Sequence, residues 1–359
     1  MRAAKLMGAF GPLIAHTVVS GMPGALGAAG AVDSSVSVDY PTDFPALTGR
    51  PSVARLRAIA AAMAGFDLVL TYNWGAIDAV MARRIFAGKM ALPPLVHHED
   101  GFNQDEAAGL KWQRNLFRRL ALPGAAALVV PSRVLERIAL ETWHQPANRV
   151  RRIANGIPLA EFAHPPRADA LPGLIKRPGD LWLGTMAGLR AVKNLPRLVR
   201  AFAAMPRPWQ LVIVGDGPER DAILAEAARL GLSDRVHLPG HAIAPAAVMG
   251  LFDLFALSSD SEQFPISVVE AMACGLAVVS PGVGDVAAMV APDNADWITA
   301  SGDHQALGSA LAEAAADPVR RERIGTANLA RATAEYGDQA MIAAYRQLYA
   351  TAMQRDAFP

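Results

Sequence analysis

Hydrophobic and polar positions alternate with two different periods along the chain, most regularly in its second half. Short runs rich in β-branched and other apolar residues recur at 181–186, 210–215, 235–240, 254–259, 277–282 and 296–301. The stretches between them, such as 195–205 and 219–232, place apolar residues at helical spacing. Strands that alternate with helices predict a parallel sheet covered by helices on both faces.

The first half repeats this alternation. Strands are predicted at 15–21, 34–40, 67–73, 93–99 and 125–132, and helices at 52–66 and 133–143. A doubly wound domain normally opens with a strand and a glycine-rich turn. Here the first periodic segment, 2–10, has helical spacing instead, so we expect that the first strand of this domain is missing.

A stretch rich in Pro and Gly, 155–180, separates the halves and predicts an interdomain linker. We therefore expect two Rossmann-like, doubly wound parallel-sheet domains that face a cleft, with boundaries at 1–160 and 161–338. The periodic tail, 339–355, predicts a helix that packs back on the first domain. Ligands of such sheets bind beyond the carboxyl ends of the strands, so polar residues after strands are the candidates.

Composition narrows the class of protein. Of 359 residues, 52% are hydrophobic, and 34 Lys and Arg balance 33 Asp and Glu, which gives no reason to expect a nucleic-acid partner. The single cysteine, Cys274, excludes an intrachain disulfide and a cysteine metal cage. We find neither a signal-peptide pattern nor an apolar run of the roughly 20 residues that span a bilayer, and therefore expect a cytoplasmic protein.

Two cations lie in the loop after the strand at 181–186. Arg190 and Lys193 precede Asn194, a good helix N-cap, and Pro196 in the first helical turn. Fixed cations beside the N–H groups of a helix N-terminus form an anion site. The alternative is a pair of solvated loop charges.

Two carboxylates stand eight residues apart after the strand at 254–259. Pro265 suits the first turn of a helix that Gly275 ends, which places Glu262 in the preceding loop and Glu270 within the helix. Carboxylates accept hydrogen bonds from hydroxyl pairs, so the two could hold a sugar and a ribose. The alternative is a solvated helix surface, but the apolar neighbours of Glu270 weaken it.

His97 and His98 end the strand at 93–99. Adjacent strand residues point to opposite faces, so the two form a poor chelating pair and we predict no metal site. Either histidine could contact a ligand, in competition with Glu99 and Asp100, or be satisfied within the core.

The segment 110–120, LKWQRNLFRRL, predicts a basic amphipathic helix. We favour a core-facing apolar stripe with a solvated basic face, because aromatic residues at helical spacing are usually core. The alternative is a helix that lies on an anionic membrane surface.

The order of motifs resembles a known family. Gly188, Lys193 and Asn194 form a G-x-x-x-x-K-N loop, and VGDGP at 214–218 and the segment 258–280 follow it. This order resembles the retaining glycosyltransferases of family four, which have the GT-B fold. TYNWGA at 71–76, HHEDGFNQDEA at 97–107 and PSRVLERIA at 131–139 resemble bacterial members that build cell-surface polysaccharides.

The resemblance implies a role for each candidate. Arg190 and Lys193 would hold the donor diphosphate, Glu262 would contact the transferred sugar, and His97 or His98 would match a cleft histidine at that sugar. The nucleotide side would be bound by Glu270, Gly215, Pro265, Ile266 and Ser267. Neither a metal nor a further cofactor is implied, because the nucleoside-diphosphate sugar is the donor substrate.

Two features depart from the family pattern. The family commonly has Arg where this chain has Gly188. The family's glycine pair after the first strand is not visible, since the glycine-rich stretch 20–30 follows the second expected strand.

By this resemblance we expect transfer of a hexose, with retention of configuration, to a hydroxyl acceptor in cell-surface polysaccharide or lipopolysaccharide biosynthesis. The partners would be the donor and a glycan or lipid-linked acceptor, with peripheral contact at the inner membrane surface. The alternatives are a nucleotide-sugar epimerase on the same fold and a non-catalytic partner that binds sugar nucleotides.

Overall fold

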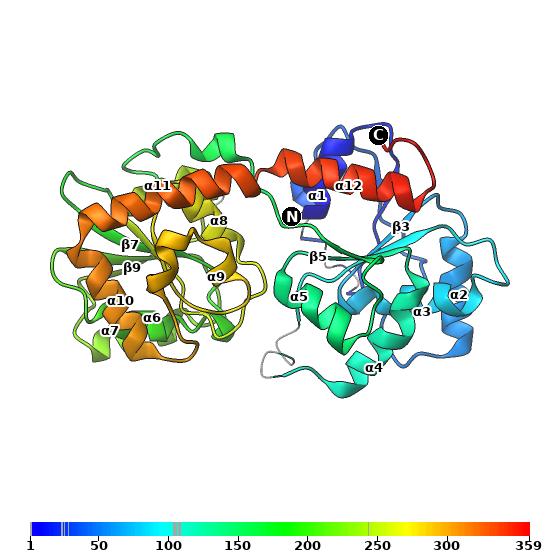
Figure 1. Cartoon of the computed structure of the whole chain (residues 1–359), viewed down its shortest axis with the longest axis horizontal. Coiled ribbons are helices and arrows are strands. Elements are labelled where there is room, and N and C mark those ends of the chain that lie inside the picture. The colour runs from blue at the N-terminus through cyan, green and yellow to red at the C-terminus, as the bar shows by residue number, and fades with distance from the viewer. Residues whose placement is uncertain are drawn as a thin grey trace. The chain divides into compact units, whose positions relative to one another are not determined.

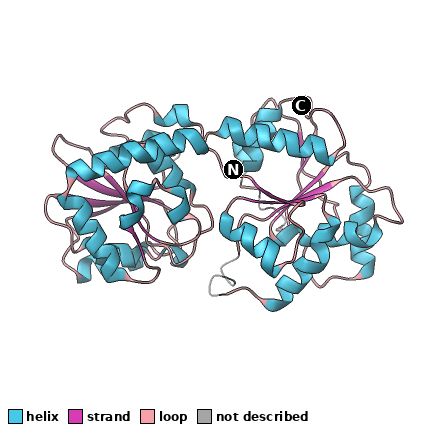
Figure 2. Ribbon diagram, viewed as in Figure 1, coloured by secondary structure: helices cyan, strands magenta, loops and turns pink. Residues whose placement is uncertain are grey.

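The computed structural model describes residues 2–359 except 23, 25, 28, 103–105, 107, 108 and 243. The exceptions include parts of two segments discussed above, 20–30 and 97–107, and those parts lie outside the described residues. The chain divides into two compact units (Figures 1 and 2). Unit 1 is Met1–Asn155 with Gln339–Pro359, and unit 2 is Gly156–Asp338.

Unit 2 contains a six-stranded parallel sheet in the order β12-β11-β10-β7-β8-β9. Its strands are β7 (Leu181–Met186), β8 (Trp209–Val214), β9 (Val236–Gly240), β10 (Leu254–Ala256), β11 (Val278–Pro281) and β12 (Ile298–Thr299). All six predicted strands are present. Numbered from β7, the order is 3-2-1-4-5-6 read from β9, which is the doubly wound arrangement of dinucleotide-binding sheets.

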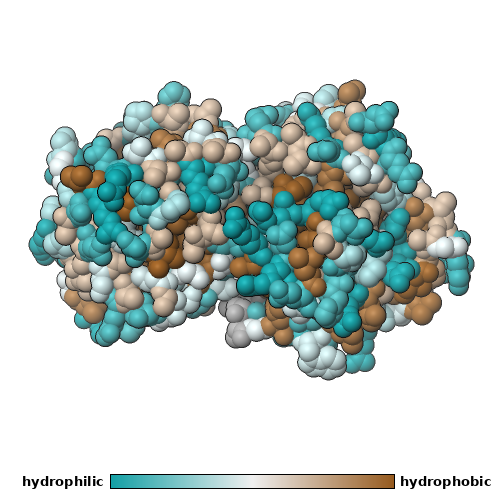
Figure 3. Space-filling view, viewed as in Figure 1, coloured by the Kyte–Doolittle hydropathy of each residue, from teal (hydrophilic) through white to brown (hydrophobic). Residues whose placement is uncertain are grey.

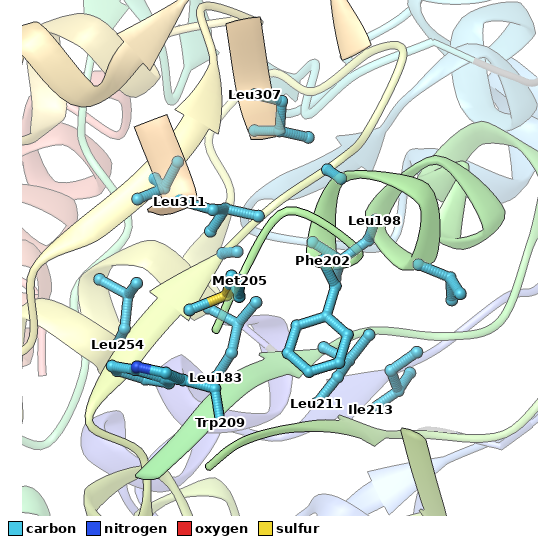
Figure 4. Packing of buried hydrophobic residues seen from close by; sticks show 14 of the residues in the cluster. Leu183, Leu198, Phe202, Met205, Trp209, Leu211, Ile213, Leu254, Leu307 and Leu311 are labelled. Carbon is cyan, nitrogen blue, oxygen red and sulfur yellow. The ribbon is translucent and has the colours of Figure 1, made fainter. Parts of the chain in front are cut away.

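Helices cover both faces of this sheet. Unit 2 contains α6 (Leu195–Phe202), α7 (Arg220–Arg229), α8 (Ile266–Ala273), α9 (Val286–Met289), α10 (His304–Ala316) and α11 (Pro318–Glu335). Leu198 and Phe202 of α6 and Leu307 of α10 pack with Leu183 and Leu211 of the sheet (Figure 4). Helix α8 packs instead against α11 and β11. Full burial of each such side chain contributes about 1.5–3 kcal/mol.

Unit 1 contains a four-stranded parallel sheet in the order β3-β4-β5-β6 and a separate two-stranded parallel sheet, β1-β2. The strands are β1 (His16–Thr17), β2 (Val38–Asp39), β3 (Val69–Tyr72), β4 (Leu95–His98), β5 (Ala127–Val130) and β6 (Val150–Arg152). Five lie within the predicted runs, and β6 is an addition to the prediction.

The helices of unit 1 lie on two faces of the larger sheet (Figure 1). They are α1 (Arg2–Phe10), α2 (Val53–Met63), α3 (Ile77–Phe86), α4 (Trp112–Ala121), α5 (Arg133–Arg137), continued by a π-helical turn Ile138–Thr142, and α12 (Asp338–Ala352). Helices α1 and α12 pack with Val96 and Val129, whereas α2, α3 and α5 pack with Leu95 and Leu128. The tail helix therefore belongs to unit 1. Among the described residues, no helix is both long and apolar enough to cross a membrane.

Candidate functional site

The site of unit 2 lies at the carboxyl ends of β7 and β10. In the order 3-2-1-4-5-6 these neighbouring strands are the first and the fourth, so the sheet changes its winding direction between them. The loops after such a pair leave toward opposite faces and open a crevice where ligands bind. The loop after β7 carries Arg190 and Lys193, and the loop after β10 carries Glu262.

Lys193 and Glu262 meet across this point. Lys193 Nζ donates to Glu262 Oε1 at 2.6 Å, and Ser259 Oγ donates to the same oxygen at 2.7 Å. A further hydrogen bond, from Ser258 Oγ to the Lys193 carbonyl at 2.9 Å, ties the two loops together. The side chains are only 17% and 10% exposed, so the pair is held in one geometry and not as a solvated surface contact.

Arg190 lies on the same loop, immediately before the 3₁₀ turn Ala191–Lys193, and is exposed. Its Nε lies 3.6 Å from the point where a Cβ on Gly188 would stand. The guanidinium group of Arg190 therefore occupies space beside residue 188, where the family commonly has its own arginine.

Asn194 precedes helix α6, as predicted, but its side chain does not cap the helix. Its backbone has a left-handed conformation, φ 44°, and its Nδ2 donates to Asp260 at 3.2 Å. Arg197 pairs with the same carboxylate and donates to the Ser258 carbonyl at 3.2 Å. Sequence reasoning missed Asp260 and Arg197, although an acidic residue directly after a strand was a usable signal.

Helix α8 begins directly after the loop that carries Glu262. Pro265 is its N-cap, with Ile266 and Ser267 in the first turn. Ile266 is exposed and Ser267 and Glu270 are partly exposed, whereas Val268 and the other apolar residues of the helix are buried. Burial, together with the nearby charge of Glu270, raises the pKa of the Cys274 thiol to about 12, so this thiol stays protonated at neutral pH.

Gly215 brings the loops after β7 and β8 together. Its φ is 151°, and a Cβ at this position would lie 1.9 Å from the carbonyl oxygen of Ala187. Its N–H already donates to the Gly240 carbonyl at 2.8 Å. This amide is therefore not available to a phosphate, and Gly215 shapes the site through close packing. Gly284 likewise allows close packing beside the site, because a Cβ there would lie 2.5 Å from the Glu262 carbonyl oxygen.

Both histidine side chains are fully buried, and their ring nitrogens contact residues of unit 1. His98 Nδ1 lies 3.1 Å from the Thr71 carbonyl and therefore donates to it, which leaves Nε2 to accept from the Tyr349 hydroxyl at 3.0 Å. His97 Nδ1 lies 2.8 Å from Thr71 Oγ1 on the other face of the sheet. No described residue donates to or accepts from His97 Nε2 by a hydrogen bond, and this atom lies 3.5 Å from Glu99 Oε2.

Within the described residues, no group of three or more His, Cys, Asp or Glu side chains could hold a metal ion. The cations and hydroxyl groups at the carboxyl ends of β7 and β10 can seat an anionic ligand that is rich in hydroxyl groups.

Two families match the two units. Residues 173–331 match Glycosyl transferases group 1, and residues 14–161 match Glycosyltransferase Family 4. The N-acetyl-alpha-D-glucosaminyl L-malate synthase of Bacillus anthracis is 25% identical over 173 residues, 48% of this chain and 45% of that protein. The lipopolysaccharide core biosynthesis mannosyltransferase LpcC of Rhizobium leguminosarum is 30% identical over 178 residues, 46% of this chain and 49% of that protein.

Solved structures show the same fold. HepE of Anabaena in complex with UDP superposes with a TM-score of 0.75 at 19% identity, over 94% of this chain and all of that one. The chain therefore has the GT-B fold, and its two units are similar to these two glycosyltransferase families. The chain spans about half the length of the curated relatives named above.

Proposed function

We propose that the protein is a retaining glycosyltransferase that moves a hexose from a nucleoside-diphosphate sugar to a hydroxyl acceptor. The observation that carries this proposal is the contact of Lys193 with Glu262 at the switch point of unit 2. A diphosphate needs fixed positive charge, and the hydroxyl groups of a hexose need hydrogen-bond acceptors. Lys193 and Glu262 offer one group of each kind, 2.6 Å apart. The UDP complex of the structurally similar HepE supports such a donor.

Lys193 and Arg190 would stabilise the leaving diphosphate. Negative charge grows on that group in an oxocarbenium-like transition state, so cations that are already in place stabilise the transition state more than the bound donor. An ammonium group has three N–H donors. Glu262 uses one in the structure, and the others can reach phosphate oxygens while Glu262 keeps the lysine oriented.

Helix α8 would bind the nucleotide side of the donor. The first-turn N–H groups of Ile266 and Ser267 lie at the positive end of the helix dipole, which favours a phosphate. Glu270, one turn after Ser267 on the partly exposed face, would accept hydrogen bonds from the ribose hydroxyls. A front-face displacement, in which the leaving phosphate helps to deprotonate the acceptor, would retain the configuration without a covalent nucleophile or a metal.

The acceptor belongs to cell-surface polysaccharide or lipopolysaccharide biosynthesis in this proposal, with the enzyme at the cytoplasmic side. The relative LpcC, named for lipopolysaccharide core biosynthesis, supports this assignment.

A thermal-shift panel of UDP-, GDP-, ADP- and CMP-sugars tests the donor class. A donor at about 100 times its dissociation constant adds about 2.7 kcal/mol to the free energy of unfolding. We expect one nucleoside diphosphate series to stabilise the wild type, and the Lys193→Ala variant to lose that shift. No shift with any of the sugars would contradict the proposal.

Turnover separates the transferase from its rivals. We expect release of nucleoside diphosphate that depends on an added acceptor. Conversion of the sugar nucleotide without an acceptor would instead show an epimerase, and binding without turnover under any acceptor would show a non-catalytic partner.

A further inference from the structure

The loop that carries Lys193 is tied down on both sides of this residue. The Asp260 N–H donates to the carbonyl of Val192, one position before Lys193, at 2.9 Å. The side chain of Asn194, one position after Lys193, donates to the Asp260 carboxylate at 3.2 Å. The Lys193 carbonyl itself accepts from the Ser258 hydroxyl at 2.9 Å. Three consecutive residues are therefore bonded to the loop after β10, which fixes the backbone from which the Lys193 side chain extends.

Asn194 leads the chain from this loop into α6 in a left-handed conformation, with φ 44° and ψ 48°. A Cβ disfavours this conformation, which asparagine and aspartate tolerate better than other residues that have a side chain. The Asp260 carboxylate holds the Asn194 amide and also pairs with Arg197 in the first turn of α6. These three side chains are named the Asp260 clamp. The clamp favours the backbone conformation from which Lys193 reaches Glu262.

The two charged members of the clamp differ in exposure. The Arg197 side chain is 12% exposed and that of Asp260 is 48% exposed. Arg197 also donates to the Ser258 carbonyl at 3.2 Å, so its guanidinium group has a fixed place from which it holds the carboxylate. Teal hydrophilic residues are spread over the face of unit 2 in Figure 3, so an exposed carboxylate alone identifies no site. Asp260 differs from these because its contacts converge on the residues beside Lys193.

We propose that Asp260 and Arg197 are positioning residues of the transferase. They act through Asn194 to keep Lys193 against Glu262, and thereby at the place of the leaving diphosphate. This inference rests on the proposed function and deepens it, because it assigns the groups that preorganise the cation. A misplacement of about 1 Å at a reacting group costs about 100-fold in rate, so the clamp contributes to kcat although Asp260 does not touch the donor.

Turnover of Asp260→Ala tests the role. This variant loses the acceptor of Asn194 and Arg197 but keeps the N–H that donates to Val192, and it should fold because the side chain is half exposed. We expect kcat to fall about 10- to 100-fold. The double variant Asp260→Ala/Lys193→Ala should be no slower than Lys193→Ala, because a residue that acts through the lysine has no effect once the lysine is gone.

Glycine at position 194 separates positioning from direct contact with the ligand. Glycine adopts a positive φ without support from a side chain, so in the Asn194→Gly background Asp260→Ala should lower kcat by less than about threefold. Asn194→Ala should be about as slow as Asp260→Ala, since alanine neither tolerates this conformation nor donates a hydrogen bond. Equal losses from Asp260→Ala in the wild type and in the Asn194→Gly background would assign the carboxylate to the ligand and overturn the inference.

Chemical labelling reads the position of Lys193 without turnover. Its side chain is 17% exposed, and a succinimidyl ester modifies lysines according to their exposure. Peptide mass spectrometry then quantifies the labelling of Lys193 relative to that of exposed Lys89 in the same sample. Asp260→Ala should increase this ratio at least about fivefold, because the loop opens more often. An unchanged ratio would overturn the inference whatever the acceptor is.

Asp234→Ala is the matched control. Asp234 is also an exposed carboxylate that pairs with an arginine, Arg207 at 3.1 Å, but it precedes β9 and so lies at the amino ends of the strands. Its kcat and its Lys193 labelling should equal those of the wild type. Wild-type turnover in both Lys193→Ala and Asp260→Ala would contradict the proposed function together with the clamp. A slow Lys193→Ala beside a fully active Asp260→Ala would contradict the clamp alone.

Discussion

Lys193 and Glu262 stand 69 positions apart in the chain and meet at 2.6 Å. Their loops follow the two strands between which the sheet of unit 2 changes its winding direction. The ion pair thus links two loops that the topology would otherwise send apart, and it holds a cation at the carboxyl ends of these two strands. The contribution of this ion pair is better measured by its effect on kcat than by its effect on the free energy of unfolding.

Replacement of Lys193 by Ala should lower kcat about 10²–10³-fold, because the variant lacks a preorganised cation at the leaving diphosphate. The fold should survive, since Ser259 still donates to Glu262 after the lysine is lost. Because Glu262 is largely buried and loses its cation, we expect a loss of about 1–3 kcal/mol in the free energy of unfolding. Steady-state kinetics and thermal melts measure the two effects.

Arg200→Ala is the matched control for Lys193→Ala. Arg200 also belongs to the α6 region and forms an ion pair, with Glu226 at 3.0 Å, but it lies outside the site. Its kcat should equal that of the wild type. A Lys193→Ala enzyme as active as Arg200→Ala would remove the lysine from the mechanism.

By the resemblance, Arg190 should supply the charge that the family commonly places two positions earlier, at residue 188. Arg190→Ala is expected to lower kcat/KM about 10- to 100-fold. The double variant Arg190→Ala/Gly188→Arg should recover most of this loss. Among the described residues other than the two chain neighbours of Gly188, only the Arg190 side chain lies within 4 Å of a Cβ at position 188. Initial rates at low donor concentration give kcat/KM directly.

Charge and volume are separated by a second double variant. Arg190→Ala/Gly188→Ala fills position 188 without a guanidinium group and should stay as slow as Arg190→Ala. Equal rescue by alanine and arginine would show that the loop needs bulk and not charge.

Gly215→Ala should destabilise unit 2 by more than about 3 kcal/mol, because the new Cβ would collide with the Ala187 carbonyl at 1.9 Å. At about 2–4 °C per kcal/mol, its transition should fall by at least about 6 °C in calorimetry. Gly231→Ala is the control, since Gly231 has φ 67° and nothing lies within 4 Å of its Cβ position. It should cost only about 1–2 kcal/mol. Equal losses would refute the steric account of Gly215.

The sheet of unit 2 was predictable because its inner strands β7, β8, β10 and β11 are mostly apolar and mostly buried. Strand β6 was missed because two of its three residues are exposed arginines, Arg151 and Arg152, which hide the apolar pattern. The orientation of α4 was predicted wrongly for a different reason. Arg118 of this helix is fully buried against Glu99 and Trp143, which lie outside α4, and periodicity within a helix cannot show which face such partners cover.

Part of the candidate site was predictable from the sequence in the same way. Lys193 and Glu262 lie in the loops that follow β7 and β10, so the parallel topology brings them to one edge of the sheet. The contact between them depends on loop conformations, including the left-handed Asn194, that residue spacing does not encode. His98 shows the limit of this reasoning, because a polar residue at a strand end can equally be a core residue beneath a helix from the chain terminus.

Stability of unit 1 should fall as the pH drops below 6.5, because of His98. Burial, followed by the charge of Arg2, lowers the pKa of His98 well below 6.5. Below pH 6.5 the unfolded chain therefore binds a proton that the folded state refuses, and the free energy of unfolding decreases by up to about 1.4 kcal/mol per pH unit. This loss continues down to the folded pKa, whereas above pH 6.5 the histidine is neutral in both states and contributes no slope. The ionisable groups around it are Arg2, Tyr72, His97, Asp100, Tyr345 and Tyr349.

Calorimetry at pH 7.5 and 5.5 isolates this effect when His98→Gln is compared with the wild type. The variant should be less stable at pH 7.5, since it loses the packing of the ring against Tyr72 at 4.5 Å, but its transition should fall less on acidification. His144→Asn removes an exposed histidine of the same unit, at a position with φ 52° that asparagine tolerates, and should keep the full pH dependence. If His98→Gln and the wild type lose equal stability between the two pH values, the acid sensitivity arises elsewhere. The partly buried histidines His16 and His237, whose pKa values burial also lowers, then become the candidates.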